Sequence, residues 1–379
     1  MLKRTNAAVN ESNAKANVGL QLRRARKSLG LSVVEAAQTI DVAESELLAW
    51  ERGIARPTIE QLWVLADLYH RGSDYFLKDI PALPEAATFR SDLVHSIQDL
   101  PTPAKLALVR FDELCRASAN LEAAVGEHRR VTFRRDHVDA APDDLARTER
   151  ARLGLGDSPI RDLRATLSET GVRVFVLPLP GLPPQELSGL SWWHPEYGPC
   201  VLVNGRNNVG RRAFTLAHEY AHLLRSGDAV GCGFMVETPE ERYANRFASN
   251  FLMPETSVAV AFNKTVGVPH TDPTDYQLGS LASRFGVSLE AMGWRLESMH
   301  LVRHGFTSEQ IERWEARPFR GRGARGPRWR KQLGEDFVSL AMAAYDSGQV
   351  SSAKLAKYFG LDIRQTVDAL RKEENQPSG

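Results

Sequence analysis

The feature that most constrains this chain is the pentapeptide His218-Glu219-Tyr220-Ala221-His222. An α-helix turns by about 100° per residue, so residues four apart project from the same face, one turn apart. The surrounding sequence, RRAFTLAHEYAHLLRS, predicts a helix, because apolar residues recur through it and no Gly or Pro interrupts it. Two imidazoles at this separation can hold one zinc ion, with a carboxylate beside them to accept a proton. The pentapeptide therefore predicts a metal site on a helix.

A catalytic zinc ion needs a third protein ligand, and the chain offers an acidic residue for it. Such a site has three protein ligands and one position open to water. Glu241 follows His222 by nineteen residues, within a second amphipathic segment, PEERYANRFASNFLMP. The apolar residues of that segment predict a helix that packs against the first one and brings a carboxylate to the imidazoles. Glu240 and Glu237 are rival ligands, because spacing alone does not decide which carboxylate points inward.

Several neighbouring residues are candidates for the chemistry of this site. Zinc lowers the pKa of a water molecule that it binds to about 7, and Glu219 is placed to take that proton and pass it to a leaving amine. Asn245 can hydrogen-bond a ligating histidine and fix its tautomer. His194 and Tyr243 are candidates for stabilising an oxyanion, with a structural role as the alternative for each. The edge of a predicted hairpin at 188–203 can hold an extended peptide by strand addition.

The cysteines exclude two classes of small stabilised domain. Cys115, Cys200 and Cys232 are odd in number, widely spaced and without CxxC spacing. This pattern argues against a disulfide framework and against a zinc knuckle built from thiolates. Cys200 and Cys232 flank the pentapeptide, so a further hypothesis is that one thiolate caps the zinc as an inhibitory fourth ligand. The alternative is an ordinary buried cysteine.

Length and composition indicate several folded domains and argue against a membrane protein. The chain has 379 residues, too many for one ordinary core, and its 42% hydrophobic and 25% charged residues are typical of soluble globular proteins. No apolar run approaches the ~18 residues of a membrane span, and the N-terminus lacks the hydrophobic core of a signal peptide. We therefore expect a cytoplasmic protein with no membrane partner.

Shifts in composition divide the chain into six segments. Strand-like stretches, GVRVFVLPL and LSGLSWWHPEYGPCVLVNG, precede the two helices described above, which indicates an α+β unit. The end of the chain shows short helices around a Gly-bearing turn, and no long internal repeat is apparent. The predicted segments are a disordered tail (1–17), a helix-turn-helix (18–77), a helical connector and linker (78–141), the α+β unit (142–302), a basic Arg/Gly-rich segment (303–331) and a small helical C-terminal module (332–379).

Residues 18–77 form a succession of short amphipathic helices, which predicts an all-α helix-turn-helix domain. Gly30 ends the first predicted helix, Ser32 is the expected N-cap of the second, and Gly53 closes the third. In such a domain the start of the third helix enters the major groove of DNA. The candidate DNA-binding residues are Arg23, Arg24, Ala43, Glu44, Ser45, Glu46 and Arg52.

The net charge of this domain does not decide whether it binds DNA or protein. Residues 18–77 contain seven Arg and Lys against eight Asp and Glu, a net charge of −1. A surface that follows DNA phosphates leans positive. The alternative to DNA binding is therefore that the domain recognises a protein partner or dimerises. A homodimer is itself an expectation, since such domains often bind palindromic sites as dimers.

The segment at 303–331 is a second candidate for nucleic acid. It carries nine Arg and Lys against three acidic residues. Trp314, Phe319 and Trp329 are interleaved with the arginines, a mixture that suits phosphate contact together with base stacking. One hypothesis is that this segment binds single-stranded DNA and regulates the rest of the chain. The alternative is a solvated, flexible linker.

Two families resemble parts of this chain. Four stretches in the order LSGLSWWHPEYGPCVLVN, RRAFTLAHEYAHLL, EERYANRFASNFLMP and LASRFGVSLEAMGWRL resemble the ImmA/IrrE family of metallopeptidases, over residues 142–300 or so. Residues 18–77 resemble the Cro/C1 (XRE) family of DNA-binding domains, in LRRARKSLGLSVVEAA, VAESELLAWERG and RPTIEQLWVLADLY. One departure is Val33, where the XRE family commonly has Gln after the Ser that opens its second helix.

The resemblances imply a fold and a function. They imply a zincin-like α+β peptidase domain, one zinc ion held by His218, His222 and Glu241, and Glu219 as the catalytic residue. Members of the ImmA/IrrE family typically cleave a helix-turn-helix repressor in response to DNA damage or a mobile-element signal. We therefore expect a zinc-dependent endopeptidase that regulates transcription. The alternatives are a transcriptional regulator whose peptidase-like domain senses a signal or partner without cleaving, and a toxin–antitoxin or phage-element component.

Overall fold

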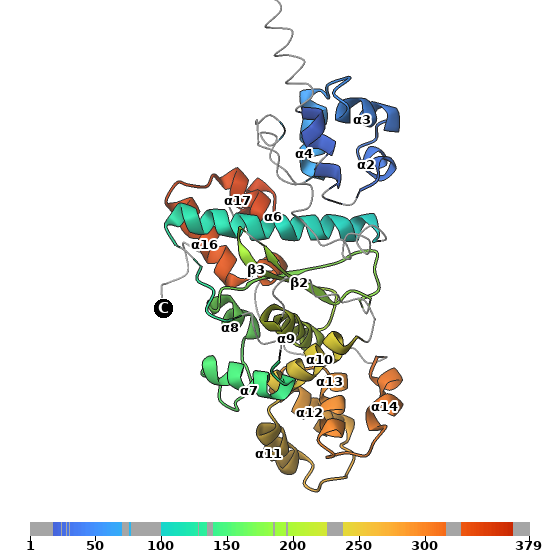
Figure 1. Ribbon diagram of the computed structural model, residues 1–379, viewed down its shortest axis with the longest axis vertical. Helices are drawn as coiled ribbons and strands as arrows, with labels where there is room; N and C mark the ends of the chain where they lie inside the picture. The colour runs from blue at the N-terminus through green and yellow to red at the C-terminus, as the bar shows by residue number, and fades with distance from the viewer. Residues whose placement is uncertain are drawn as a thin grey trace, which may run out of the picture. The chain divides into compact units, whose positions relative to one another are not determined.

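The computed structural model describes residues 18–69 except 24, 28 and 30, residue 76, residues 100–134 except 128, residues 139–225 except 185 and 195, and residues 238–315 and 327–366. The predicted tail at 1–17 lies outside this set. The chain divides into two compact units (Figure 1): Met1–Glu113 with Leu179–Leu182, and Leu114–Pro178 with Pro183–Gly379. Among the helices described, none combines the length and the hydropathy needed to cross a bilayer.

The first unit contains the predicted helix-turn-helix. Residues 18–23 and 25–27 are helical and precede α2 (Val33–Thr39), α3 (Glu44–Glu51) and α4 (Ile59–Leu68). Ser32 caps α2 as expected, since its side chain accepts a hydrogen bond from the backbone of Glu35 while the Glu35 carboxylate accepts one from the backbone of Ser32. Thr58 and Gln61 form the same reciprocal cap at α4. Each cap satisfies donors that the first turn of a helix leaves unpaired.

A buried ion pair joins the first helix of this unit to α3. The Arg26 guanidinium donates two hydrogen bonds to the Glu51 carboxylate, at 2.5 and 2.7 Å, and a third to the carbonyl of Leu31 at 2.7 Å. The side chains of Arg26 and Glu51 are 9% and 2% exposed. The hydrogen bonds that Arg26 donates to Glu51 outweigh the loss of hydration and raise the pKa of Arg26 above its ordinary value. This pair lies beside the apolar core formed by Leu22, Leu47, Trp50 and Leu65.

The second unit is built on a three-stranded sheet. The strands are β1 (Arg173–Leu177), β2 (Gly189–His194) and β3 (Gly198–Asn204), in the order β1-β3-β2. β1 runs parallel to β3, and β2 forms the predicted antiparallel hairpin with β3. α6 (Thr102–Val125) begins in the first unit and ends in the second, and α7 (Pro142–Arg152) and α8 (Leu163–Glu169) precede the sheet.

Helices cover both faces of this sheet. Val174, Val201 and Val203 belong to the core that also contains Leu216 and Ala217 of α9 (Val209–Arg225). Successive strand residues point to opposite faces. Phe175 accordingly packs on the other side, edge-on against Phe337 of α16 (Glu335–Asp346) at 5.4 Å. α9 and α16 therefore lie on opposite sides of the sheet (Figure 1).

Helices after α9 complete the second unit. They are α10 (Pro239–Leu252), α11 (Glu255–Thr265), α12 (Asp275–Phe285), α13 (Leu289–Ser298), α14 (Phe306–Glu315), α15 (Arg328–Leu333), α16 and α17 (Ser352–Phe359). α10 packs between α9 and α7. In the described residues helical secondary structure dominates, with one small sheet, so the predicted α+β class with an all-α helix-turn-helix is confirmed.

α15 packs against β1 and α16 packs against α8, while α17 packs on α15 and α16. The Arg164 guanidinium, on α8, donates to the carbonyls of Lys331 at 2.9 Å and Gln332 at 3.2 Å, and also to those of Leu333 and Val174. This side chain therefore satisfies carbonyl groups at the end of α15 and one in β1. The residues expected to form a separate C-terminal module belong, as far as residue 366, to the same compact unit as the sheet. The proposed boundaries of the six segments stay predictions.

Candidate metal centre

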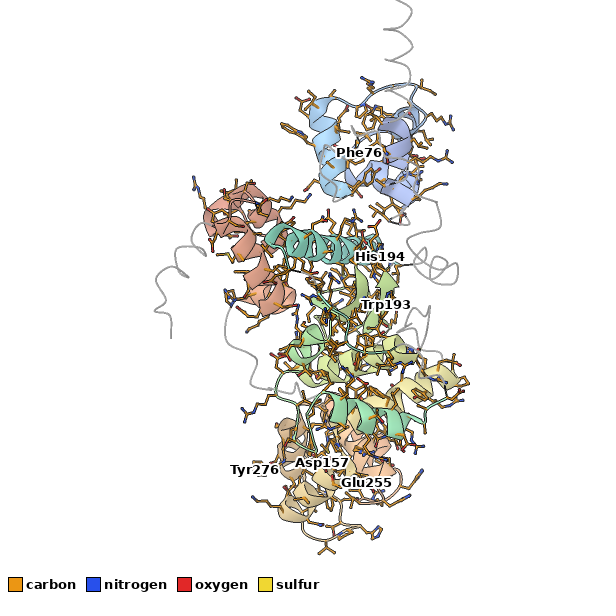
Figure 2. All side chains as sticks on the ribbon, turned by 60° about the vertical axis from the view of Figure 1, so that its left-hand side comes forward. Phe76, Asp157, Trp193, His194, Glu255 and Tyr276 are labelled. Carbon is orange, nitrogen blue, oxygen red and sulfur yellow. The ribbon has the colours of Figure 1, made fainter. Side chains whose placement is uncertain are left out.

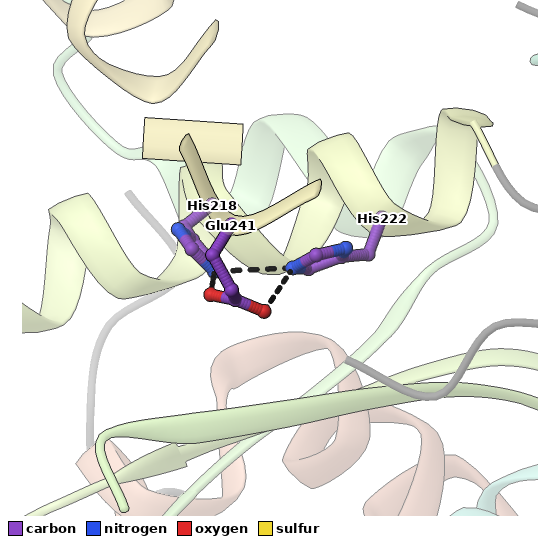
Figure 3. A group of neighbouring side chains, drawn as sticks. All are labelled: His218, His222 and Glu241. Atoms are coloured by element: carbon purple, nitrogen blue, oxygen red, sulfur yellow. Dashed lines mark hydrogen bonds and ion pairs between the residues drawn. The ribbon is translucent and has the colours of Figure 1, made fainter. Parts of the chain in front are cut away.

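His218 and His222 lie on the face of α9 that is directed into the second unit. The two side chains are largely buried, and each residue is 8% exposed. Their Nε2 atoms are 3.1 Å apart and their ring planes cross at 69° (Figure 3). The helical spacing of four residues produces this approach, as the sequence predicts.

Glu241 comes to the two imidazoles from the first turn of α10. Thr238 caps this helix by accepting a hydrogen bond from the Glu241 backbone, at 3.2 Å. One carboxylate oxygen of Glu241 is 3.0 Å from His218 Nε2, and the other is 3.3 Å from His222 Nε2 (Figure 3). Of the rival carboxylates, Glu240 is exposed to solvent and Glu237 lies outside the described residues.

These three side chains fit a zinc ion. Within the described ranges they form a group of potential metal ligands whose donor atoms lie within 4.8 Å of one another. Zinc binds nitrogen and oxygen at roughly 2.0–2.1 Å in a tetrahedron, which places neighbouring ligand atoms about 3.3 Å apart. The three observed separations, 3.0, 3.1 and 3.3 Å, are close to this value. Two imidazoles and one carboxylate also leave one tetrahedral position for a further ligand.

Asn245 orients one of the imidazoles. Its side-chain oxygen lies 2.9 Å from Nδ1 of His218. An amide oxygen can only accept a hydrogen bond, so this contact requires the proton to be on Nδ1. The lone pair of the neutral ring is then on Nε2, the atom that faces Glu241 and His222. Asn245 thus lies where the sequence places it, one turn beyond Glu241 on α10.

The three groups perturb one another electrostatically. Burial raises the pKa of Glu241, but the hydrogen bonds from His218 and His222 outweigh it and lower the pKa to about 2. Burial lowers the pKa of His218, but its hydrogen bond with Glu241 outweighs this effect and raises the pKa above the ordinary value. Both shifts favour a Glu241 carboxylate paired with a His218 imidazolium.

Glu219 is buried next to this group and is bound to the sheet. The residue is 1% exposed, and its carboxylate accepts a hydrogen bond of 2.8 Å from the hydroxyl of Ser191 on β2. Burial raises the pKa of Glu219 above its ordinary value, although the two imidazoles and the Ser191 hydroxyl oppose this. Gly189 on β2 allows the approach, since a Cβ there would press on Thr215 and lie 3.4 Å from Glu219 Cγ.

Two family models match the chain in the regions described above. Residues 22–76 match the helix-turn-helix family HTH_3, and residues 167–297 match Peptidase_M78, the IrrE N-terminal-like domain. The chain joins a helix-turn-helix domain to an IrrE N-terminal-like domain. This finding confirms the predicted fusion of the two families. A search of the curated proteins found no match to the chain.

The rear face of α9 in the IrrE-like domain is held by a polar network that the sequence analysis missed. The Tyr220 hydroxyl donates to Glu149 of α7 at 2.7 Å and accepts from Arg152 at 2.9 Å. Burial and the Glu149 carboxylate raise the pKa of Tyr220 far above its ordinary value, which keeps the hydroxyl protonated. Phe133, from the predicted linker, packs edge-on against Tyr220 at 5.4 Å. These contacts fix the position of the helix that carries His218 and His222.

The two oxyanion candidates have structural partners. The Tyr243 hydroxyl donates to the carbonyl of Ala140 at 2.7 Å, and the Arg225 guanidinium lies 4.0 Å above the Tyr243 ring. His194 ends β2 (Figure 2), and its ring stacks on Tyr197 at 3.5 Å. The structure therefore supports the structural alternative for both residues, and an oxyanion role for either stays a prediction.

The described cysteine near the pentapeptide is not part of the candidate metal centre. Cys200 is fully buried on β3, where its thiol lies 3.5 Å from the carbonyl of Gly198. It does not belong to the group formed by the three candidate ligands in the described part of the chain. Cys232 lies outside the described residues, so capping by that thiolate stays a prediction.

The candidate DNA-binding residues of the helix-turn-helix are mostly at the surface. Arg23 and Arg52 are exposed, as are the four residues at the start of α3, Ala43, Glu44, Ser45 and Glu46. Glu46 accepts a hydrogen bond of 3.2 Å from Gln61 of α4. Arg24 lies outside the described residues. The family match supports a DNA-binding type of domain, and the roles of single residues stay predictions.

The described residues of the basic segment at 303–331 are largely helical. α14 and α15 occupy much of it, Trp314 is buried against Phe306, and Trp329 stacks on Phe359 of α17 at 4.5 Å. These two aromatic rings are therefore engaged within the protein, and Phe319 lies outside the described residues. Base stacking by Trp314 and Trp329 would require them to leave these contacts.

Proposed function

We propose that the chain is a zinc-dependent endopeptidase with an attached DNA-binding domain. The observation that carries this proposal is the convergence of His218, His222 and Glu241 beside the buried carboxylate of Glu219. The proposed substrate is a helix-turn-helix repressor, and cleaving it would relieve repression in a stress or mobile-element response. The match of residues 167–297 to a peptidase family supports the proposal at the level of the reaction class.

The residues of the site have separate roles in this proposal. A zinc ion held by the three ligands would supply a Lewis acid for attack on a peptide carbonyl. Asn245 keeps the His218 Nε2 lone pair directed at the ligand position. Glu219 accepts and returns the proton, and its burial favours this role because it raises the pKa toward the range useful for proton transfer at neutral pH. Ser191 holds the Glu219 carboxylate in place.

The open edge of the sheet lies beside this site. β2 is an outer strand that pairs with β3 on one side, and within the described residues no strand pairs with its other side. α9 packs directly on β2, and Ser191 of β2 contacts Glu219. An extended peptide added along this edge would pass next to Glu219, with main-chain hydrogen bonds setting its register. This geometry favours an unfolded or locally extended cleavage site in the substrate.

The first test compares wild type with Glu219→Ala during co-expression with repressors encoded nearby. We expect wild type to shorten one repressor and the variant to leave it intact, because the variant keeps the metal ligands but lacks the proton acceptor. Mass spectrometry of the shortened repressor would locate the cleaved bond. A repressor shortened equally by both proteins would refute hydrolysis that depends on Glu219.

The second test separates a peptidase from a regulator that only senses. Zinc content is measured by mass spectrometry for wild type, Glu219→Ala and His222→Ala. Loss of zinc only in His222→Ala, together with loss of cleavage in both variants, is expected for the enzyme. Zinc binding without cleavage of any repressor, combined with metal-dependent DNA binding, would instead support a transcriptional regulator that senses a signal without cleaving.

A further inference from the structure

The turn between α2 and α3 has a distinctive backbone geometry. Asp41 has a positive φ of 54°, in the left-handed region, and follows the end of α2. The next residue, Val42, donates its backbone N–H to the carbonyl of Ala37 at 3.0 Å. Ala43 is then extended, with φ −68° and ψ 143°, and begins α3 as its N-cap. This turn sets the angle at which the third helix of the domain leaves the second.

The same turn occurs at the end of α17, in the other compact unit. Gly360 has a φ of 65°, and the N–H of Leu361 donates to the carbonyl of Ala356 at 3.0 Å. Asp362 follows, and its carboxylate accepts the N–H of Gln365 at 2.7 Å, so that a new helix begins at residue 363. In both places a serine N-cap precedes the left-handed residue by nine positions, Ser32 before Asp41 and Ser351 before Gly360.

The buried positions of the two motifs also correspond. α2 buries Ala36 and Ala37, and α17 buries Leu355 and Ala356 at the equivalent positions. Val42 and Leu361 directly follow the left-handed residues of the two motifs. Five positions after them, Leu47 and Thr366 are each 0% exposed. A helix-turn-helix needs small or apolar residues at these positions, because there the second helix packs on its neighbours. Residues 351–366 therefore contain the turn and the packing pattern of a second helix-turn-helix.

A third copy of the turn, between α12 and α13, shows how the geometry can serve packing alone. Gly286 has a φ of 69°, and the Val287 N–H donates to the carbonyl of Ala282 at 3.0 Å. The backbone of α9 comes so close to this turn that a Cβ on Gly210 would overlap Val287 and Ser288. The start of α13 is thus covered by another helix. The start of α13 therefore cannot enter a groove of DNA.

The C-terminal copy differs from both others at its surface. The first residues of its last helix, Ile363, Arg364 and Gln365, are exposed, and so is Lys354 on α17. Between 351 and 366 the chain carries three basic residues and one acidic residue, Asp362, whose carboxylate is used as the helix cap. The equivalent surface of the first motif presents Glu44 and Glu46 instead.

We propose that residues 351–366 form a second helix-turn-helix, whose ligand is duplex DNA. Lys354 is placed to contact phosphates, as is Lys357, which is exposed on the same helix. Arg364 and Gln365 are placed at the start of the helix that begins at residue 363, and from this position such motifs reach base edges. Arg328 and Lys331 of α15, which packs against α17, add exposed positive charge nearby. The chain would then contact DNA through elements of both compact units.

The proposal is tested with the full chain and a labelled duplex of random sequence, about 24 base pairs long, or two helical turns. The variant is Lys354→Glu/Arg364→Glu, and the matched control is Lys264→Glu/Arg284→Glu, which reverses two exposed charges on α11 and α12. Fluorescence anisotropy gives the dissociation constant between about 50 and 200 mM salt. We expect the variant, and not the control, to bind at least tenfold more weakly, with a salt dependence shallower by about two counterions.

Photocrosslinking distinguishes this site from the first helix-turn-helix, which is unchanged in all these variants. A photoreactive amino acid replaces Gln365 in one protein and Ser283, an exposed residue of α12, in another. We expect crosslinks to the duplex from position 365 and none from position 283. Equal DNA affinity in both double variants, or no crosslink from position 365, would overturn the proposal. Crosslinks to protein alone would assign this surface to a protein partner and overturn it too.

Discussion

At the scale of single residues, the candidate metal centre depends on one hydrogen bond that fixes a tautomer. The contact of 2.9 Å between Asn245 and His218 keeps the Nδ1 proton in place and leaves Nε2 to bind a metal. Without it the ring can adopt the other tautomer or rotate. Groups that hold a ligating histidine in this way typically change metal affinity by about 10–100-fold when they are removed.

We therefore predict that Asn245→Ala weakens zinc binding by about 10–100-fold. The matched control is Asn250→Ala on the same helix, because Asn250 bonds Asp143 and the backbone of Arg246 instead of a histidine. Competition with a chelating dye measures both affinities. Equal affinities for the two variants would show that Asn245 does not act on the metal site.

The residues of this site divide into those that the sequence can reveal and those that it cannot. His218, His222 and Asn245 could be predicted because helical periodicity places residues three or four apart on one face. Ser191 and Glu149 could not, because they come from a strand and a helix distant in sequence and reach α9 only when the chain is folded. A serine within a strand or a glutamate within a helix carries no local signal of a buried partner.

At the scale of secondary-structure elements, α9 depends on a close approach to the α12–α13 turn. Gly210 lies in the first turn of α9, and a Cβ there would overlap the backbone of Val287 and Ser288. Backbone atoms cannot move aside as a flexible side chain can. Any larger residue at position 210 must therefore displace the helix that carries His218 and His222.

We predict that Gly210→Ala destabilises the IrrE-like domain by about 1–3 kcal/mol, the usual cost of overpacking. Gly279→Ala on α12 is the control, since its Cβ would meet no neighbour closer than 4.0 Å. Replacing a glycine within a helix by alanine there should stabilise by up to about 1 kcal/mol. Urea unfolding followed by circular dichroism measures both. A variant Gly210→Ala as stable as wild type would show that the close packing is relieved at no cost.

Elements were easier to predict than the relations between them. The helix cap formed by Ser32 and the hairpin of β2 and β3 follow from the local sequence, and the structure confirms both. The strand order β1-β3-β2 could not be predicted, because the parallel pairing of β1 with β3 depends on contacts across the segment between them. The backbone similarity of three turns could not be predicted either. Their left-handed residues are Asp41, Gly286 and Gly360. The backbone conformation is therefore similar in the three turns although their sequences differ.

At the scale of the whole molecule, the helix-turn-helix and the IrrE-like domain each have a hydrophobic core of their own among the described residues. One contains Leu22, Leu47 and Trp50 of the helix-turn-helix, and the other contains Tyr220 and Phe251 of the IrrE-like domain. The two clusters share no residue. The ion pair between Arg26 and Glu51 belongs to the first, and the candidate metal centre belongs to the second.

We predict two independent unfolding transitions. Glu51→Gln should lower the stability of the first unit by about 3–5 kcal/mol, because it leaves the buried Arg26 charge without its partner. Added zinc should raise only the transition of the second unit, since a ligand stabilises the state that binds it. Differential scanning calorimetry resolves the transitions, with the exposed Glu44→Gln as the control. One transition that responds to both changes would contradict this division.

The contacts made by Arg164 have a consequence for the self-association of the protein. α15 packs against β1, and Arg164 joins the end of that helix to the carbonyl of Val174 in this strand. A sheet that grows into a fibril must add strands at both rims, and an unprotected rim is where such growth starts. In the described part of the chain a helix shields one rim, and only β2 is left to accept a guest strand. An extended segment added along β2 would therefore leave no second open edge among the described strands for further growth.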